Sequence, residues 1–264
     1  MTYEDIILEK EGGVAILTLN RPDKLNALNA RIMAELASAV TEVDEDDDMK
    51  ALIITGAGRG FCSGADLTPS TSGERVVPGR RLLLEPMGGF GLVARVLTNT
   101  DKPTIGAVNG VAAGAGFSIA AACDIRIASE NARFSAIFVR RALVPDSGLT
   151  YFLPRIVGIS KAVELCITGD MIDATEAERI GLVSRVVPHT DLMKAAKEFA
   201  ARIAQGPSVA IELAKRAVYK GLENDLATSL AYETWAQNIC QQTEDREEGR
   251  RSFIEKREPV FRGR

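Results

Sequence analysis

The sequence predicts an α/β fold followed by a helical C-terminal region, and three observations carry this prediction. Short apolar runs that end at Gly, Pro or Asn alternate with segments of helical periodicity up to about residue 190. Beyond Pro188, four segments have helical periodicity and none has the pattern of a strand. With 264 residues, 46% of them hydrophobic, the chain can bury a full core. We therefore expect a core over residues 1–190 and a helical region over residues 191–264.

The individual elements follow in chain order. Ile6–Glu9 and Val14–Leu19 flank two glycines and predict a β-hairpin. Asn29–Val43 places its apolar side chains on one face, which predicts a helix with Asn29 as its N-cap. Further expected elements are strands at Ala51–Thr55, Pro103–Val108 and Asp124–Ala128, helices at Phe90–Asn99 and Ala112–Cys123, and a short helix opened by the capping box Thr175-Glu-Ala-Glu178 and closed by Gly181. The C-terminal helices are expected at Asp191–Ala204, Ser208–Lys220, Asp225–Gln241 and Glu244–Glu258.

Composition excludes several classes of function. A net charge of −4 does not provide the broad basic surface that nucleic-acid binding usually needs. The four cysteines are far apart in the sequence and form no C-x-x-C pair, so we expect reduced core thiols. The N-terminal residues lack the pattern of a secretory signal, and the longest weakly polar run, Gly110–Cys123, is too short to span a bilayer. We expect a cytoplasmic protein that binds neither nucleic acid nor a membrane.

Familiar catalytic motifs are missing from the sequence. Neither glycine-rich turn fits the dinucleotide pattern G-x-G-x-x-G, no G-K-[ST] phosphate loop occurs, and no G-x-S-x-G nucleophile elbow occurs. The only histidine, His189, lies at the expected boundary and is predicted to be structural or exposed. Because no group of His, Cys and carboxylates has the spacing of metal ligands, we expect no metal and no redox cofactor.

Two carboxylates stand out from the others. Asp66 follows Ser63-Gly64-Ala65 at the end of a glycine-rich loop, and Asp146 lies between an apolar stretch and Tyr151-Phe152-Leu153. A carboxylate among apolar groups can act as a general base or acid near neutral pH. Each can also be a plain turn residue or a helix N-cap, so the residues alone leave both interpretations open.

One arrangement occurs twice along the chain. The strand Ala51–Thr55 leads to Gly64-Ala65-Asp66, and the strand Pro103–Val108 leads to Gly114-Ala115-Gly116. Each unit is a buried strand, a glycine-rich turn and an expected helix start. Two such units side by side would aim two backbone N–H groups at one point.

Eight segments of the chain match a known set of motifs. They are, in chain order, Asn20–Leu28, Gly60–Leu67, Lys102–Gly110, Ala112–Gly116, Cys123–Ala128, Thr168–Asp170, Gly181–Val183 and the tail from Glu248 to Lys256. Together they resemble the signature segments of the enoyl-CoA hydratase/isomerase (crotonase) superfamily over nearly the whole chain. The resemblance implies a fold of repeated ββα units, followed by C-terminal helices that mediate trimerisation. It therefore implies a trimer, or a dimer of trimers, as the assembled form.

The resemblance also implies how an acyl-coenzyme A thioester binds. It places an oxyanion hole at the backbone N–H groups of Ala65 and Ala115, in agreement with the repeated arrangement above. It places coenzyme A along the loop Ala65–Thr68, with Lys24–Ala27 near the adenine, and nucleotide contacts from Phe253 and Lys256 that often come from a neighbouring subunit. The implied substrate-binding residues are Lys24, Leu25, Ala27, Ala65, Asp66, Leu67, Thr68, Ala115, Phe253 and Lys256. No cofactor is implied beyond the coenzyme A of the substrate.

Members of this superfamily share the oxyanion hole and differ in their acid and base residues. Hydratases have two glutamates, at positions where this chain has Ser118 and Phe138. Asp146 instead matches the catalytic aspartate of an isomerase-like branch, which includes enzymes resembling 2-(1,2-epoxy-1,2-dihydrophenyl)acetyl-CoA isomerase. The resemblance thus favours an acyl-CoA isomerase that shifts a double bond or opens a ring epoxide, with Asp146 as acid and base. A hydratase or hydrolase in which Asp146 positions water, and a non-catalytic acyl-CoA-binding protein, remain as alternatives.

The acyl group of the substrate is expected to contact a pocket wall that comes from several parts of the chain. The expected wall of its pocket consists of Thr68–Gly89, Phe138, Tyr151 and Trp235, and Thr68–Gly89 is the least regular stretch of the chain.

Overall fold

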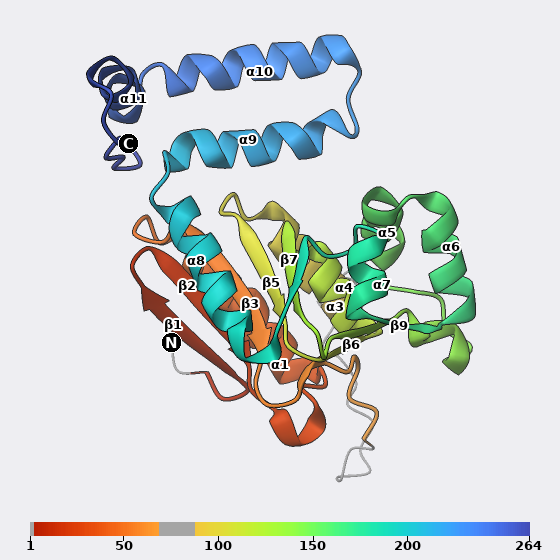
Figure 1. Cartoon of the computed structure of the whole chain (residues 1–264). Coiled ribbons are helices and arrows are strands. Elements are labelled where there is room, and N and C mark those ends of the chain that lie inside the picture. The colour runs from red at the N-terminus through yellow and green to blue at the C-terminus, as the bar shows by residue number, and fades with distance from the viewer. Residues whose placement is uncertain (1–2, 69–87) are drawn as a thin grey trace.

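A six-stranded sheet forms the centre of the molecule (Figure 1). The computed structural model describes residues 3–68 and 88–264. The strand order of this sheet is β1-β2-β3-β5-β7-β10, in which β1 pairs antiparallel to β2 and all other neighbours pair parallel. Its strands are β1 (Ile6–Glu11), β2 (Val14–Leu19), β3 (Ala51–Gly56), β5 (Thr104–Val108), β7 (Ile125–Ser129) and β10 (Arg185–Val187). The predicted hairpin and the three predicted buried strands are confirmed.

A second, smaller sheet lies beside the first and has the order β4-β6-β8-β9. Its strands have three residues each: β4 (Gly60–Cys62), β6 (Val111–Ala113), β8 (Arg133–Ser135) and β9 (Met171–Asp173). β4, β6 and β8 each follow a strand of the large sheet, so the chain repeats a strand, a turn and a second strand before a helix. The α/β class and the repeated ββα units are thereby confirmed. The prediction of one helix over Ala112–Cys123 was wrong at its start, where β6 and a turn at Gly114 precede the helix.

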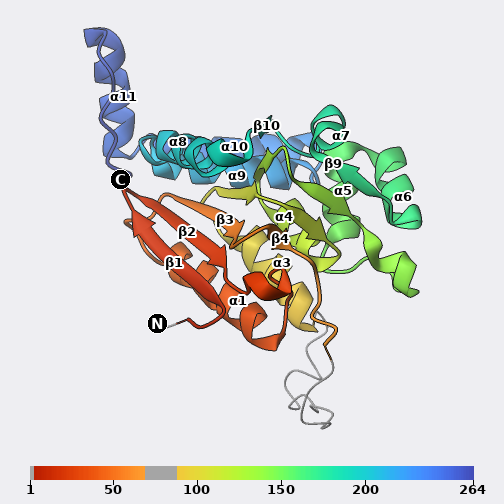
Figure 2. The same cartoon turned by 60° about the horizontal axis from the view of Figure 1, so that its bottom comes forward.

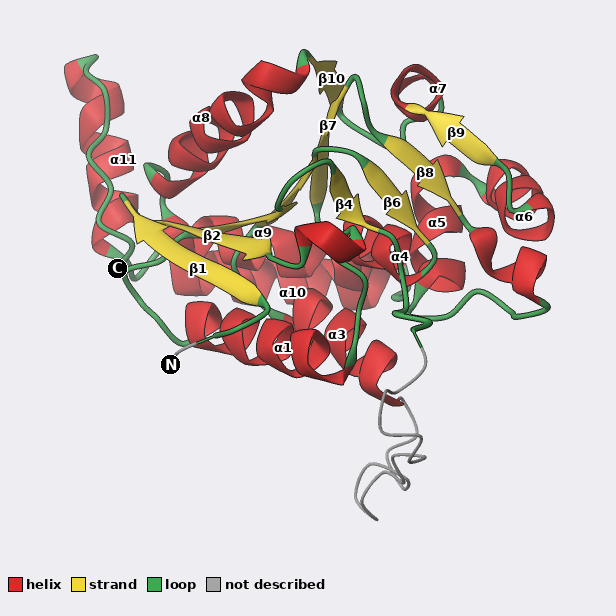
Figure 3. Cartoon of the chain, turned by 90° about the horizontal axis from the view of Figure 1, so that it is seen from below, coloured by secondary structure: helices red, strands yellow, loops and turns green. Residues whose placement is uncertain are grey.

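Helices cover both faces of the large sheet (Figure 3). On one face lie α1 (Ala30–Asp44), α3 (Gly88–Asn99) and α4 (Ala115–Ala122), and on the other lies α8 (Leu192–Ala204). Neighbouring residues of a strand enter different cores: Leu52 packs with the first group of helices, whereas Ile53 packs with α8. This alternation follows from the two-residue period of a strand. Asn29 caps α1 as predicted, because its side chain accepts a hydrogen bond from Ile32 N at 2.9 Å.

The last three helices project from the core (Figures 1 and 2). α9 (Ser208–Gly221) and α10 (Leu226–Cys240) lie antiparallel to each other, and α11 (Glu244–Glu255) stands at their end. The four predicted C-terminal helices are all present. The first of them, α8, packs on the sheet although it follows residue 190, so the projecting part begins at α9. The division of the chain at residue 190 stays a prediction.

Three further helices and several short turns connect these layers. They are α5 (Leu149–Val157), α6 (Ile159–Thr168), α7 (Ala174–Arg179) and the 3₁₀ turns at Pro22–Lys24, Ile137–Arg141 and His189–Asp191. The N-cap of α7 is Asp173, whose carboxylate accepts a hydrogen bond from Glu176 N, so the predicted capping box at Thr175 was wrong. Of the helices that the structure describes, none is long and apolar enough to cross a bilayer.

A buried ion pair joins α9 to the core. The ammonium group of Lys215 lies 2.7 Å from Asp124 Oδ2, and the two side chains are 8% and 14% exposed. The other carboxylate oxygen accepts a hydrogen bond of 2.8 Å from the hydroxyl of Tyr219, which also belongs to α9. Thr104 donates to Asp124 from its backbone N–H and its hydroxyl. Asp124 therefore holds two side chains of the projecting helix at the N-terminal end of β7.

We expect Asp124→Asn to lower the free energy of unfolding by roughly 2 kcal/mol, because it leaves a buried ammonium group without its counter-charge. The loss is moderate because Lys215 still donates to the Lys102 carbonyl oxygen at 2.9 Å. Urea denaturation measures the effect. Asp170→Asn is the matched control, since it breaks an exposed pair with Arg140 whose side chains are 63% and 55% exposed. Exposed pairs contribute little, so equal losses in the two variants would contradict this account.

Candidate active site

The segment that contains Lys24, Leu25 and Ala27 lies alongside the loop that contains Ala65. Ser63 N donates to Leu25 O at 3.0 Å, and Leu28 N donates to Gly64 O at 2.7 Å. Asp66 N in turn donates to Leu28 O at 2.9 Å. The two parts of the chain that were predicted to line the coenzyme A site are thus brought together, although about forty residues separate them in the sequence.

Asn26 locks this arrangement and was not singled out from the sequence. Its side chain is fully buried, and its amide nitrogen lies 2.8–3.1 Å from the carbonyl oxygens of Ala57, Gly60 and Phe61. Its amide oxygen accepts a hydrogen bond from Arg21 N at 2.9 Å. The backbone φ of Asn26 is 56°, a left-handed conformation that Asn tolerates better than most residues. An Asn inside a tight turn was the available signal.

The backbone N–H of Ala65 points away from Leu28. Ala65 forms a parallel bridge with Leu28 in which the neighbours of Ala65, Gly64 and Asp66, make both hydrogen bonds. Successive peptide groups of an extended strand face opposite sides, so the N–H of Ala65 itself faces the second sheet. No acceptor for it exists within residues 3–68 and 88–264. It is a free hydrogen-bond donor in the described part of the chain.

Ala115 supplies a second free N–H group. It is the first residue of α4, where backbone N–H groups have no partner inside the helix. The described residues provide no other acceptor for it. The positive end of the helix dipole adds to the attraction that this N–H exerts on an oxygen that gains negative charge.

The turns that carry these two N–H groups touch each other. A Cβ atom on Gly64 would lie 2.8 Å from the Ala113 carbonyl oxygen and 3.5 Å from Ala115 N. The φ of Gly64 is 95°, which a residue with a side chain rarely adopts. Glycine at this position therefore permits the close approach of the two turns. The proximity that the repeated arrangement predicted is present.

Asp146 lies beside α4, in the loop between the 3₁₀ turn Ile137–Arg141 and α5. Its carbonyl oxygen accepts a hydrogen bond of 3.1 Å from the hydroxyl of Ser118, one turn along α4 from Ala115. Ala115, Ser118 and Ser147 line one small cavity between α3 and α4. Asp146 is thus attached to the helix that carries one free N–H group.

The sequence predicted apolar surroundings for Asp146, and within a single chain this prediction was wrong. Its side chain is exposed, and the apolar residues before it, Leu143 and Val144, are 57% and 75% exposed. The reason is the backbone of the loop, which adopts left-handed conformations at Ala142 and Ser147, with φ values of 54° and 55°. These conformations turn the loop outward between two helical segments.

Asp66 has the environment of a structural anion. Hydrogen bonds from Thr68 and the guanidinium of Arg21 lower the pKa of Asp66 to about 2. Arg21 Nη2 lies 2.8 Å from one carboxylate oxygen, and Thr68 N donates to the other at 3.0 Å. A carboxylate with so low a pKa is a weak base at neutral pH. We assign Asp66 the task of holding the loop Ala65–Thr68, and the general-base interpretation of Asp66 does not fit this geometry.

A family profile described as enoyl-CoA hydratase/isomerase matches residues 9–264. The chain belongs to this family. Enzymes of the enoyl-CoA hydratase/isomerase family act on acyl-CoA thioesters.

The curated relatives of this enoyl-CoA hydratase/isomerase family member include both named activities. The chain is 42% identical to the short-chain-enoyl-CoA hydratase of Clostridium acetobutylicum over 262 residues, which cover 97% of each protein. It is 37% identical to the 1,2-epoxyphenylacetyl-CoA isomerase of Escherichia coli over 261 residues, or 99% of each. Among solved structures, a putative enoyl-CoA hydratase from Streptomyces coelicolor superposes with a TM-score of 0.92 at 37% identity, covering 100% of this chain and 96% of that one.

Within this family member, Ser118 and Phe138 occupy the positions at which glutamates were expected in a hydratase. Ser118 is fully buried and Phe138 is 7% exposed. The ring of Phe138 closes on the turn of α4, because a Cβ atom on Gly114 would lie 3.9 Å from its Cζ. Neither side chain can transfer a proton as a carboxylate does.

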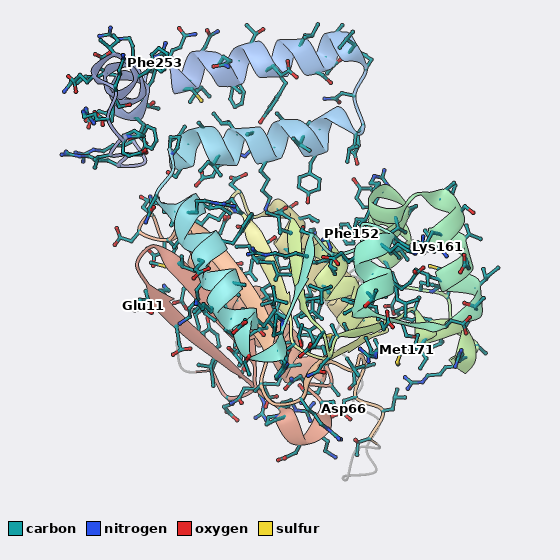
Figure 4. All side chains as sticks on the ribbon, viewed as in Figure 1. Glu11, Asp66, Phe152, Lys161, Met171 and Phe253 are labelled. Atoms are coloured by element: carbon teal, nitrogen blue, oxygen red, sulfur yellow. The ribbon has the colours of Figure 1, made fainter. Side chains whose placement is uncertain are left out.

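Phe253 and Lys256 lie far from the loop Ala65–Thr68 within one chain. Figure 4 shows Phe253 on α11 at the opposite end of the molecule from Asp66. Phe253 is 85% exposed and Lys256 follows the last turn of α11. A contact between these residues and a nucleotide bound at the loop would need a second subunit. Of the expected acyl-pocket wall, residues 69–87 lie outside the described residues.

Proposed function

We propose that the protein is an acyl-CoA isomerase in which Asp146 moves a proton between two carbons of the acyl chain. The observation that carries this proposal is the attachment of Asp146 to α4, beside the free N–H of Ala115. The two positions for hydratase glutamates hold Ser118 and Phe138, so Asp146 is the carboxylate of this region that remains available for proton transfer.

In the proposed reaction, the thioester oxygen accepts hydrogen bonds from the N–H groups of Ala65 and Ala115. The carboxylate of Asp146 takes a proton from the carbon next to the thioester carbonyl, or from its vinylogous position, and a dienolate forms. The two donors stabilise the negative charge on the oxygen as it develops. The protonated Asp146 then returns the proton at the other end of the dienolate, and the double bond has moved. With a ring epoxide whose oxygen is bonded to the carbon next to the α carbon, Asp146 would remove the α proton, that carbon–oxygen bond would break as the enolate forms the new double bond, and the protonated Asp146 would give the proton to the alkoxide oxygen.

Coenzyme A is proposed to lie along Ala65–Thr68, next to the segment with Lys24, Leu25 and Ala27. Leu67 and Thr68 are exposed there, as a binding surface requires. Lys24 is also exposed and provides a positive charge for the phosphates of the nucleotide. Phe253 and Lys256 are proposed to reach the nucleotide from a neighbouring subunit.

Hydration is the second candidate, because several relatives are named enoyl-CoA hydratases. Asp146 is exposed and could orient a water molecule toward a 2-enoyl thioester held by the same two N–H groups. A hydrolase would use the water against the thioester carbonyl itself. Both alternatives keep the oxyanion hole and have Asp146 activate water, and they differ in the carbon that the water attacks.

An assay with 3-enoyl-CoA and 2-enoyl-CoA substrates separates these activities. We expect 3-enoyl-CoA to be converted to its conjugated 2-enoyl isomer, which is followed by the absorbance of the conjugated thioester and by mass spectrometry. The product should have the mass of the substrate. A product heavier by one water, formed faster than the isomer, would support the hydratase, and free coenzyme A would support the hydrolase. Tight binding without turnover of any of these substrates would support a non-catalytic acyl-CoA-binding protein.

We also propose that the chain assembles as a trimer or a dimer of trimers through its projecting helices. α9, α10 and α11 enclose an open apolar groove lined by Leu213, Ala236 and Phe253, among others. Leu226 and Leu230 on α10 are 74% and 52% exposed, and an isolated subunit would leave these apolar side chains in water.

The expected result of light scattering at micromolar concentration is a trimer or hexamer mass. Placing charges on the apolar surface of α10 with Leu226→Glu and Leu230→Glu should shift the population toward monomers, because buried unpaired charges are costly at an interface. Ile7→Glu, at a half-exposed apolar position on the edge strand β1, serves as the control. A stable monomer of the parent chain under these conditions would show the proposed assembly to be wrong.

A further inference from the structure

Ser118 attaches the loop of Asp146 to α4. It is fully buried, and it follows Ala115 by three residues, so its side chain projects from the same first turn of the helix. Its hydroxyl lies 3.1 Å from the carbonyl oxygen of Asp146 and 3.4 Å from that of Gly114. The backbone of Asp146 is therefore tied to the turn that carries one of the two free N–H groups.

Ser147 acts on the side chain of Asp146. Its hydroxyl donates a hydrogen bond of 2.8 Å to Asp146 Oδ1. Ser147 is 8% exposed and has a φ of 55°, a left-handed conformation that residues other than glycine rarely adopt. Asp146 Oδ2 has no hydrogen-bond partner within the described residues.

Resting on the proposed function, we propose that Ser118 and Ser147 form a serine clamp that positions Asp146 for proton transfer. Ser118 fixes the distance from the Asp146 backbone to α4. Ser147 fixes the rotation of the carboxylate by holding Oδ1, which leaves Oδ2 as the oxygen that takes the proton and returns it. Neither serine touches the reacting carbons, so both are positioning residues.

The serine clamp answers a specific difficulty of the site. Asp146 is exposed and lies on a loop with left-handed residues, where packing alone does not determine the position of a carboxylate. A 1,3-proton shift requires one carboxylate to reach two carbons while the thioester oxygen stays on its two donors. A misplacement of about 1 Å can cost roughly 100-fold in rate. The position where a hydratase would have a glutamate thus holds the serine that places the aspartate of a different reaction.

The carbonyl oxygen of Asp146 does not need the hydrogen bond from Ser118 in order to have a partner. The carbonyl oxygen of Asp146 already accepts a hydrogen bond of 3.0 Å from Leu149 N at the start of α5. The hydroxyl of Ser118 is a second donor to the same oxygen. Its removal should therefore leave the fold in place and loosen the loop only.

The test compares Ser118→Ala and Ser147→Ala with the parent in steady-state isomerisation of 3-enoyl-CoA. We expect kcat to fall roughly 10- to 100-fold in each variant, while KM stays within about twofold because the nucleotide contacts are untouched. Ser129→Ala is the matched control. It removes the hydroxyl of another fully buried serine, which contacts His189 Nδ1 at 3.0 Å and accepts from Asn131 N, and it should leave kcat unchanged.

A second comparison separates the clamp from the proposed function. In an Asp146→Asn background, adding Ser118→Ala or Ser147→Ala should cause no further loss, because the serines act through Asp146. A further loss of the same size in that background overturns the clamp. A kcat of the single serine variants within about twofold of the parent overturns it as well, because a change that small is no larger than the change allowed for KM. If Asp146→Asn alone retains the activity of the parent, the proposed function fails and the clamp fails with it.

Discussion

Asp146→Asn is expected to lower the turnover of 3-enoyl-CoA by roughly 10²–10⁴-fold, the range typical of general acid–base catalysis. Asn has nearly the shape of Asp and can still accept the hydrogen bond from the hydroxyl of Ser147, so the loop should keep its place. It cannot take up and return a proton at neutral pH. Since the backbone donors at Ala65 and Ala115 remain, affinity for a non-reactive acyl-CoA should change little.

Two measurements together test this prediction. A steady-state isomerase assay gives the turnover, and calorimetric titration with a non-reactive acyl-CoA gives the affinity. Loss of turnover with retained affinity identifies an interaction made mainly in the transition state. Asp170→Asn, which removes an exposed carboxylate beside Arg140, is the matched control and should retain full turnover. If the Asp146 variant keeps its turnover within about threefold of the parent, the loss is well below the range of general acid–base catalysis. Asp146 would then not be the group that transfers the proton.

Five strands of the large sheet and most of the helices could be predicted because their signals are local and repeated, whereas β10, α5 and α6 were not predicted. Val14–Leu19 and Ala51–Thr55 are largely buried runs that each adjoin a glycine at one end, and Asn29 caps a helix with one apolar face. The short strands of the second sheet could not be predicted. A strand of three residues such as β6 shows too little alternation to be distinguished from the helix that follows it.

The part of the site that could be predicted is the part that the backbone and the sheet order determine, which is the meeting of the two glycine-rich turns. The two glycine-rich turns meet because strands β3 and β5 are neighbours in the sheet, and the repeated pattern in the sequence indicates that. The exposure of Asp146 depends on left-handed residues at Ala142 and Ser147, neither of which is a glycine. No rule of composition predicts a positive φ at an alanine. Phe253 could not be placed either, because its proposed partner belongs to another subunit.

The contact between the two turns also explains which parts of the site can vary without loss of the two N–H donors. Gly64 and Gly114 have positive φ values of 95° and 54°, and the contact between their turns fixes two N–H groups by backbone geometry alone. The side chains at the positions proposed for acid or base residues lie further along the chain, at Ser118 within α4 and in the loop before α5. The reaction can therefore change with residues such as Ser118 and Asp146 while the donors stay in place.

Ala115→Pro removes one of these donors and is expected to lower kcat by roughly 10²–10³-fold, the usual effect of losing one oxyanion-hole donor. Ala115 is the first residue of α4, the helix position at which proline is best tolerated. The residue before it, Gly114, has no Cβ atom to clash with the proline ring. The helix should therefore form, and thermal unfolding should change little.

The control for Ala115→Pro is the same substitution at Ala174, the first residue of α7, which is buried and lies away from both free N–H groups. Both variants lose one N–H at a helix start, but only Ala115→Pro loses a donor proposed to face the thioester oxygen. A loss of activity of no more than about threefold would be a small fraction of the effect expected for one donor. If Ala115→Pro folds and shows only such a loss, the N–H of Ala115 does not stabilise the enolate. Combining it with Asp146→Asn extends the argument: both groups act in the same transition state, so the double variant should be less impaired than the product of the two losses.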